Sequence, residues 1–115
     1  MTKDEVKQRS EIRVGIGLDE EKMPVQLDYA GQGESPRDCK AALLSFFARD
    51  TKETMKIDLW TKDMQIVEMD RFFYQTLRSM TETYFKATQN KDLANDFQQF
   101  VFYFGRKTGA IPEEG

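Results

Sequence analysis

Few residues in this chain could do chemistry, and the residue type best suited to it is missing. The sequence holds one cysteine and no histidine. Histidine is the usual general base near neutral pH and the commonest metal ligand, so its absence excludes Ser-His-Asp triads, Cys-His pairs and histidine-containing zinc sites. Cys39 has Arg37 and Lys40 close by, as a reactive thiolate would need, but no base stands near it in sequence. We interpret Cys39 as a small packed or partly exposed residue.

The carboxylates are equally weak candidates for a site. Asp19, Glu20 and Glu21 are consecutive and lack the spaced ligands and glycine of a calcium loop. Glu68 and Asp70 lie two residues apart on an expected helix, so they do not face each other. We predict no catalytic residue, no metal site and no cofactor. An enzyme that uses carboxylates or Cys39 is the least favoured of our three hypotheses.

Composition narrows the class of protein further. The 115 residues carry a net charge of −3, with 39% hydrophobic and 32% charged residues. This mix is typical of one globular domain, and it lacks the dense basic patch of a general nucleic-acid binder. No window approaches a membrane span of about 20 apolar residues, and the first residues are charged where a signal peptide is apolar. We therefore expect a cytoplasmic protein that neither binds nucleic acid nor inserts into a membrane.

The elements that would position any site follow from periodicity. Alternating apolar residues predict an antiparallel hairpin from strands at residues 12–18 and 25–29, and another strand at 54–59. The run AALLSFFA at 41–48 fits a strand that pairs with 54–59, and a helix over 38–50 is the alternative. After Trp60 the apolar period becomes helical.

Two helices are expected after the strands. Thr61 or Asp63 would cap a helix over residues 64–87, and Asn90 a helix over 93–104 that stops at Gly105. The first helix has one apolar stripe, made of Ile66, Met69, Phe73, Leu77, Met80, Tyr84 and Ala87. The stripe of the second helix is Phe97, Phe100, Val101 and Phe104.

The predicted fold class is therefore α+β. A four-stranded antiparallel sheet of two hairpins precedes two C-terminal helices that pack on one face of it. Residues 1–10 form a mobile arm, residues 11–105 a single domain and residues 106–115 a polar tail.

Aromatic side chains outside the stripes indicate a binding surface. Helices with aromatic residues on several faces cannot bury all of them against one small sheet. Trp60 closes the last strand and points away from Met55, Ile57 and Leu59, and tryptophan is enriched at interface hot spots. The candidate protein-interaction residues are Trp60, Asp63, Phe72, Tyr74, Phe85, Phe102 and Tyr103. Packing of helix on helix, which would hide these rings, is the alternative.

With these elements placed, the chain resembles a known family. The block KIDLWTKDM at 56–64, followed by FFYQTL at 72–77 and KAT at 86–88, is similar to the gliding motility protein GldC of bacteria. The run from Ile12 to Ala30 extends the resemblance, which covers roughly residues 11–105. Tyr29, Gln65 and the run FVFYF at 100–104 depart from the family pattern, so we identify a divergent member.

The resemblance implies a non-enzymatic cytoplasmic accessory protein with protein partners in a gliding or secretion machinery. It carries over no catalytic residue. We expect a homo-oligomer or a complex. Strands followed by two helices are also similar in topology to the SecB export chaperone, so the alternative function is a chaperone or holdase that binds extended polypeptide.

Overall fold

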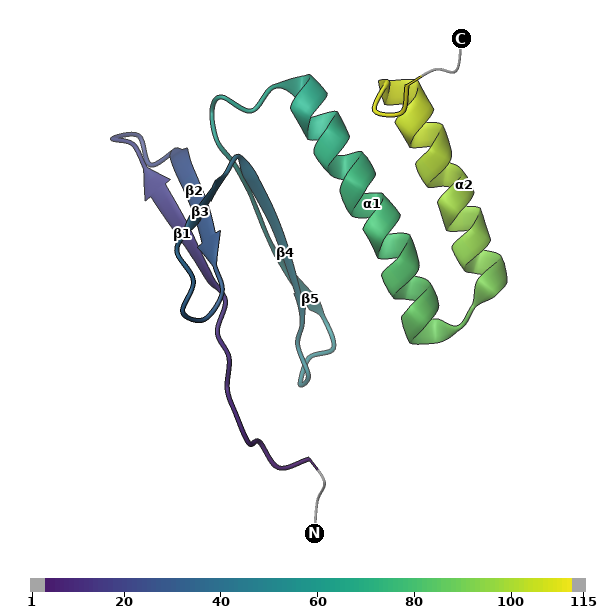
Figure 1. Ribbon diagram of the computed structural model, residues 1–115, viewed down its shortest axis with the longest axis horizontal. Helices are drawn as coiled ribbons and strands as arrows, with labels where there is room; N and C mark the ends of the chain where they lie inside the picture. Colours follow the sequence, from purple (N-terminus) through teal and green to yellow (C-terminus); the bar gives the residue numbers. More distant parts are fainter. Residues whose placement is uncertain (1–3, 113–115) are drawn as a thin grey trace. The chain divides into compact units, whose positions relative to one another are not determined.

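The structure is a computed structural model that describes residues 4–112 (Figure 1). Within them the chain divides into two compact units, one ending at Met64 and one beginning at Gln65. The first unit holds five antiparallel strands and the second two helices, which confirms the α+β class. The predicted arm at 1–10 begins outside the described residues and the predicted tail at 106–115 ends outside them. Residues 5–12 belong to no helix or strand.

The first sheet contains the hairpin predicted at the N-terminal end. Its strands, in spatial order, are β1 (Arg13–Leu18), β2 (Pro24–Ala30) and β3 (Arg37–Cys39). Ile16 lies opposite Leu27 in the antiparallel register. The side chain of Asp19 closes the turn by accepting hydrogen bonds from the backbone N–H groups of Glu21 and Met23, at 2.9 and 3.0 Å.

The second sheet consists of β4 (Ala41–Phe47) and β5 (Thr54–Trp60). The predicted strand at 41–48 is confirmed, and the alternative helix over 38–50 is wrong. A tight turn joins the strands, with Lys52 in the left-handed region at φ 61°. The N–H of Ala48 donates to the carbonyl of Glu53 at 2.9 Å and closes this turn.

The prediction of a single four-stranded sheet is wrong. Residues 37–47 are extended almost throughout, but Lys40 divides them into β3, which pairs with β2, and β4, which pairs with β5. Each half thus finds its partner in a different strand, and five strands in two sheets result. Sequence periodicity shows that a segment is extended but not where its pairing partner changes.

Helix α1 (Ile66–Thr88) begins later than predicted. Neither Thr61 nor Asp63 caps it, because residues 61–64 form a turn in which the N–H of Met64 donates to the carbonyl of Thr61 at 3.1 Å. The cap is Gln65, whose backbone N–H donates to the Glu68 carboxylate at 3.0 Å in a reciprocal capping box.

Helix α2 (Lys91–Thr108) has the predicted cap. The side chain of Asn90 accepts a hydrogen bond from the N–H of Leu93 at 3.2 Å. The predicted stop at Gly105 is wrong, since the helix continues to Thr108 and Gly109 takes the left-handed conformation at φ 80°. Gly105 is buried inside the helix, where it serves close packing.

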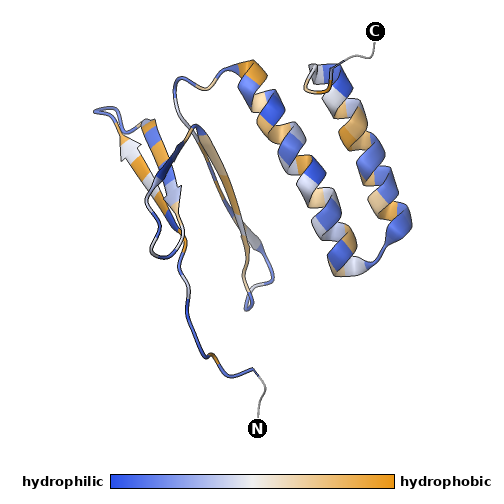
Figure 2. Ribbon diagram, viewed as in Figure 1, coloured by the Kyte–Doolittle hydropathy of each residue, from blue (hydrophilic) through white to orange (hydrophobic). Residues whose placement is uncertain are grey.

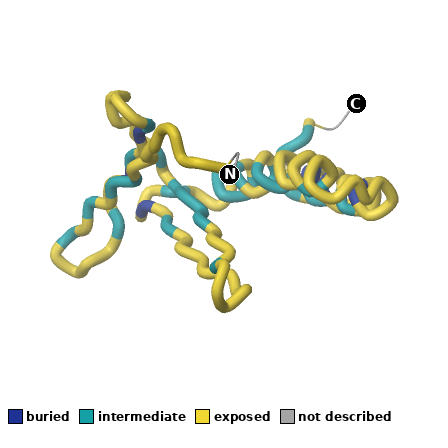
Figure 3. The backbone as a smooth tube through the Cα atoms, turned by 90° about the horizontal axis from the view of Figure 1, so that it is seen from below, coloured by how far each residue is buried: buried dark blue, intermediate teal, exposed yellow. Residues whose placement is uncertain are grey.

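Few of the described residues are buried in either unit (Figure 3). Leu27 and Ala30 form the core of the β unit, and Ala94 and Val101 that of the helical unit. Over residues 4–112, neither helix is long and apolar enough to cross a membrane.

Candidate interaction surfaces

One face of the β4–β5 hairpin is apolar along its whole length. Side chains alternate between the faces of a strand, and the observed register brings apolar residues of both strands to the same side. We call this side the hairpin face. It consists of the cross-strand pairs Ala42–Leu59, Leu44–Ile57 and Phe46–Met55. Phe46 and Met55 are both more than half exposed, so no described residue of the β unit covers the tip of this face.

The other face of the hairpin is mixed and carries Trp60. The register pairs Trp60 with Ala41, Asp58 with Leu43 and Lys56 with Ser45. Trp60 therefore points away from the hairpin face, as its place in the alternation predicts, and 55% of it is exposed. A large exposed ring at a strand end can act as an anchor for a partner.

Asp63 lies in a polar junction just after Trp60. The buried hydroxyl of Thr61 lies within hydrogen-bond distance of the Asp63 carboxylate and, at 3.3 Å, of the Lys40 carbonyl. The Lys40 ammonium lies 3.9 Å from Asp63. The hydrogen bond from Thr61, and then the Lys40 charge, hold the pKa of Asp63 below its ordinary value. Asp63 is ionised at neutral pH and fixes the start of the segment leading to α1.

The two helices contact each other through small residues. Ala94, Val101 and Gly105 of α2 are buried, as is Thr81 of α1. A methyl group placed on Gly105 would lie 2.7 Å from Cε1 of Tyr74. The line through Tyr74 and Thr81 therefore faces α2, and the absence of a side chain at Gly105 permits the close approach.

The apolar stripes of both helices lie beside this contact line. At about 100° per residue, each stripe is about a quarter turn from the line that faces the other helix, except for Val101, which lies on that line itself. Because the helices run antiparallel (Figure 1), both stripes fall on the same side of the helical unit. We call this side the helical face; Figure 2 shows the hydrophobic positions along both helices. It comprises Ile66, Met69, Phe73, Leu77, Met80, Tyr84 and Ala87 of α1 with Leu93, Phe97, Phe100 and Phe104 of α2.

The helical face carries five aromatic side chains, of which Phe73 and Phe100 are exposed and the other three are half-buried. The ring of Phe100 lies 6.3 Å from those of both Tyr103 and Phe104. Phe100 is 52% exposed and Met80 is 49% exposed. This arrangement gives a broad apolar surface on a rigid helical support, as protein interfaces require.

The predicted aromatic residues outside the stripes do not form one patch. Tyr74 faces α2, and Phe85 lines a groove beside the contact of the two helices. Phe102 lines a polar hollow on α2 with Arg106, and Tyr103 lies beside Phe100. The structure thus distributes the predicted residues over several sides, and their role in binding stays a prediction.

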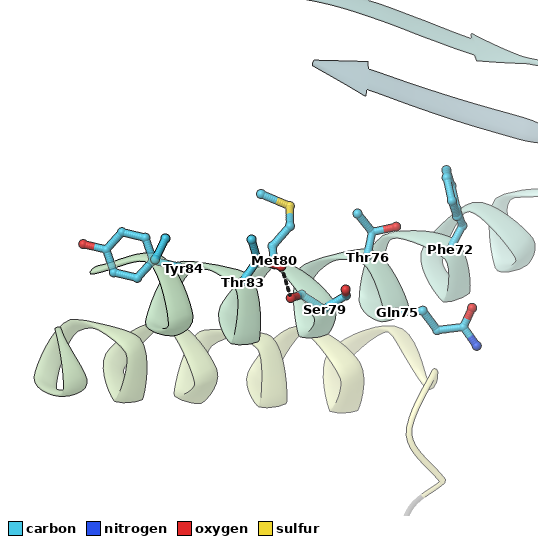
Figure 4. A pocket seen from close by; sticks show the side chains of 8 residues that line it. Phe72, Gln75, Thr76, Ser79, Met80, Thr83 and Tyr84 are labelled. Atoms are coloured by element: carbon cyan, nitrogen blue, oxygen red, sulfur yellow. Dashed lines mark hydrogen bonds between the residues drawn. The ribbon is translucent and has the colours of Figure 1, made fainter. Parts of the chain in front are cut away.

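Phe72 belongs to a shallow hollow along α1 that adjoins the helical face and shares Met80, Tyr84 and Ala87 with it (Figure 4). Its lining consists of Phe72, Gln75, Thr76, Ser79, Met80, Thr83, Tyr84 and Ala87. The hydroxyl of Thr83 donates to the Ser79 carbonyl at 3.2 Å, so the helix itself satisfies this group. The lining includes no carboxylate or cation, which suits an apolar contact better than a polar ligand.

The residues that could do chemistry are not assembled into a site. Burial, and then the charge of Asp38, raise the pKa of the Cys39 thiol, so it is protonated and weakly nucleophilic at neutral pH. Over residues 4–112 no group of three or more cysteine and acidic side chains could hold a metal ion. The Asp19 carboxylate is engaged by Lys62 and by the turn backbone.

Sequence reasoning missed the hairpin face as a candidate surface. The sequence pattern could have indicated this face, because apolar residues alternate in both strands. The short turn between the strands also determines which of these residues lie opposite each other. The sequence-based prediction assigns that side to a sheet core, and its candidate surface consists of Trp60, Asp63 and aromatic residues of the two helices.

Comparison with known proteins gives one match. The family model described as gliding motility-associated protein GldC-like matches residues 24–110. No curated protein and no solved structure was found to match. The matched region includes β2 to β5, both helices and the block KIDLWTKDM at 56–64. Since the match covers most of the 115 residues, the chain belongs to the GldC-like family.

Proposed function

We propose that this chain is a non-enzymatic cytoplasmic protein that works by binding proteins, either copies of itself or a component of a gliding or secretion machinery. The observation that carries the proposal is the aromatic cluster of α2 around the exposed ring of Phe100, which lies beside the exposed Tyr103 and the half-buried Phe104. The family supports the same reading, since its description names gliding motility.

Physical reasoning supports binding because exposed apolar surface is costly in water. Burial contributes about 25 cal/mol for each Å² of apolar surface. Soluble monomers rarely expose contiguous apolar patches larger than a few hundred Å², and larger patches mark interaction sites. The helical face and the hairpin face both bring several large side chains together, so covering either one with protein is strongly favourable.

The size of the full-length chain tests the proposal. Light scattering after gel filtration is expected to give a mass above the 13.4 kDa of one chain, or to do so once the partner is added. Phe100→Asp places a charge in the helical face and is expected to weaken the assembly at least about tenfold, since a buried unpaired charge is strongly unfavourable. Gln99→Asp is the matched control, because Gln99 is the preceding residue of α2 and is exposed.

A chain that remains monomeric with and without partner, and for which Phe100→Asp behaves like Gln99→Asp, would disprove binding through the helical face.

A second candidate function is a SecB-like holdase that binds extended polypeptide. Exposed methionines favour it, since Met55 lies on the hairpin face and Met80 on the helical face. Flexible, polarisable methionine side chains adapt to varied partners. Suppression of the aggregation of an unrelated unfolded protein, lost in Met80→Asp, would support the holdase. Indifference to unfolded chains would favour binding of one folded partner.

A further inference from the structure

The outer edge of β5 offers unpaired backbone groups. The N–H of Thr61 donates to the Lys40 carbonyl and that of Ala48 to the Glu53 carbonyl, both at 2.9 Å. Hydrogen-bonded and non-hydrogen-bonded pairs alternate along an antiparallel ladder, so the odd-numbered residues of β5 bond to β4. The N–H and C=O groups directed outward therefore belong to Thr54, Lys56, Asp58 and Trp60. Among residues 4–112, β5 pairs with no strand except β4.

The charged side chains on this edge would be complementary to the same side chains of a second copy of the chain. Lys56 and Asp58 lie on the mixed face, with their charged atoms 3.1 Å apart and their side chains 51% and 39% exposed. In an antiparallel pair of two β5 strands related by a two-fold axis at Ile57, each Lys56 lies opposite Asp58 of the second copy. Each Thr54 then lies opposite Trp60. The outward backbone groups of these four residues meet in hydrogen-bonded pairs.

The same charges disfavour the neighbouring registers. A two-fold axis at Lys56 would place two lysines opposite each other, and an axis at Asp58 would place two aspartates opposite each other. Like charges in direct cross-strand positions are destabilising. Charged residues on an edge strand commonly prevent pairing with other chains. In β5 the charges of Lys56 and Asp58 disfavour the registers with an axis at either of these residues, and they favour the register with the axis at Ile57.

The favoured register also extends the hairpin face. Ile57 would meet Ile57 of the second copy, and Met55 would meet Leu59, all on the apolar side. Non-hydrogen-bonded pairs bring side chains into close contact. Two hairpins would thereby become a continuous four-stranded sheet with one apolar side.

We propose that β5 is a self-association edge, where a second copy of this chain adds antiparallel to it about Ile57. This inference rests on the proposed function, and it names both the partner and the surface of that binding. The occupant is a second copy because the Lys56 and Asp58 pattern is self-complementary in this one register.

Disulfide trapping of the full chain in a Cys39→Ser background tests the register. In the proposed pair the two Cα atoms of residue 57 would be about 4.5 Å apart, within the range that a disulfide spans. Ile57→Cys is therefore expected to give a crosslinked dimer under mild oxidation. Met55→Cys, on the same face, is the matched control. Its two copies would lie about 13 Å apart and are expected to remain uncrosslinked.

Charge exchange provides an independent measurement. Lys56→Asp is expected to raise the dimer dissociation constant about tenfold or more, because two opposite-charge pairs become two like-charge pairs. Adding Asp58→Lys to Lys56→Asp exchanges the charges and is expected to restore association. Sedimentation velocity measures both.

The results separate this inference from the proposed function. If the chain self-associates but Ile57→Cys crosslinks no better than Met55→Cys, or if the double exchange does not restore what Lys56→Asp lost, pairing through β5 is wrong while protein binding stands. If the chain is monomeric at every concentration, self-association fails, and only a different partner could sustain the proposed function.

Discussion

Among residues 4–112, Leu27 is the large side chain that is completely buried, with 0% of its surface exposed. It lies on β2 opposite Ile16 of β1 and Cys39 of β3, so all three strands of the first sheet meet at this position. A unit with so small a core depends strongly on each buried residue.

Leu27→Ala is expected to destabilise the chain by about 2–5 kcal/mol, through lost burial and the cavity that remains. Val25→Ala, two residues earlier on β2, is the control because Val25 is nearly half exposed. Urea unfolding followed by circular dichroism measures both. Equal effects of the two substitutions would mean that Leu27 is no core residue.

The titration of Asp19 tests its interaction with Lys62 and links that interaction to the pH dependence of stability. The hydrogen bond from Lys62, followed by that from the Met23 N–H, holds the pKa of Asp19 below its ordinary value of 3.8. A carboxylate whose pKa is lower in the folded state stabilises the fold above the unfolded pKa, and this stabilisation is lost as the pH falls through the folded pKa.

Lys62→Gln is therefore expected to raise the pKa of Asp19 towards 3.8. The stabilisation of the fold by ionised Asp19 should then be lost at a higher pH than in the unsubstituted chain. A carboxyl-detected NMR titration measures the pKa directly. Lys52→Gln makes the same change of charge in the other turn and should leave Asp19 unchanged. A pKa that does not move in Lys62→Gln would disprove the pairing.

At the scale of elements, the contact between α1 and α2 depends on Gly105. A methyl group there would lie 2.5 Å from Cδ1 of Ile111 and 2.7 Å from Cε1 of Tyr74. The N–H of Ile111 donates to the Gly105 carbonyl at 3.0 Å, which holds the residue after the helix close to it.

Gly105→Ala is expected to destabilise the helical unit by up to about 2 kcal/mol. Overpacking costs about 1–3 kcal/mol, and the gain in helix propensity offsets up to about 1 kcal/mol of that cost. In an Ile111→Ala background the same substitution should cost less, because one of the two clashes is gone. Thermal unfolding of the four proteins completes this cycle. If Gly105→Ala stabilised the chain, helix propensity would dominate and the close contact would be refuted.

At the scale of the whole molecule, each unit has a small core and a larger apolar face. The helical face and the hairpin face together bring eight large exposed hydrophobic side chains into two surfaces, while Leu27 and Val101 are among the few that are buried. The exposed apolar side chains of these two faces are the feature on which the proposed protein binding rests. The size measurements and the β5 crosslinks address function at this scale.

The sequence by itself determined the class of the fold and most of its elements. Periods of two and of 3.6 residues are local properties, so they located four of the five strands and both helices, and the residue type of Asn90 indicated its cap. The short strand β3 was not predicted. The absence of histidine excluded catalytic and metal sites that contain histidine without any structure. The block around Trp60 identified the GldC-like family, which the family match from residue 24 to residue 110 confirmed.

Only the tertiary structure decided which residues meet. The exchange of partners at Lys40, the role of Gly105 in helix contact and the two apolar faces depend on pairs of residues far apart in sequence. Periodicity describes one element at a time and contains no information on its neighbour. The edge of β5 shows this most clearly, because Lys56 and Asp58 became a self-complementary pair only once the register with β4 showed which backbone groups were left to bind.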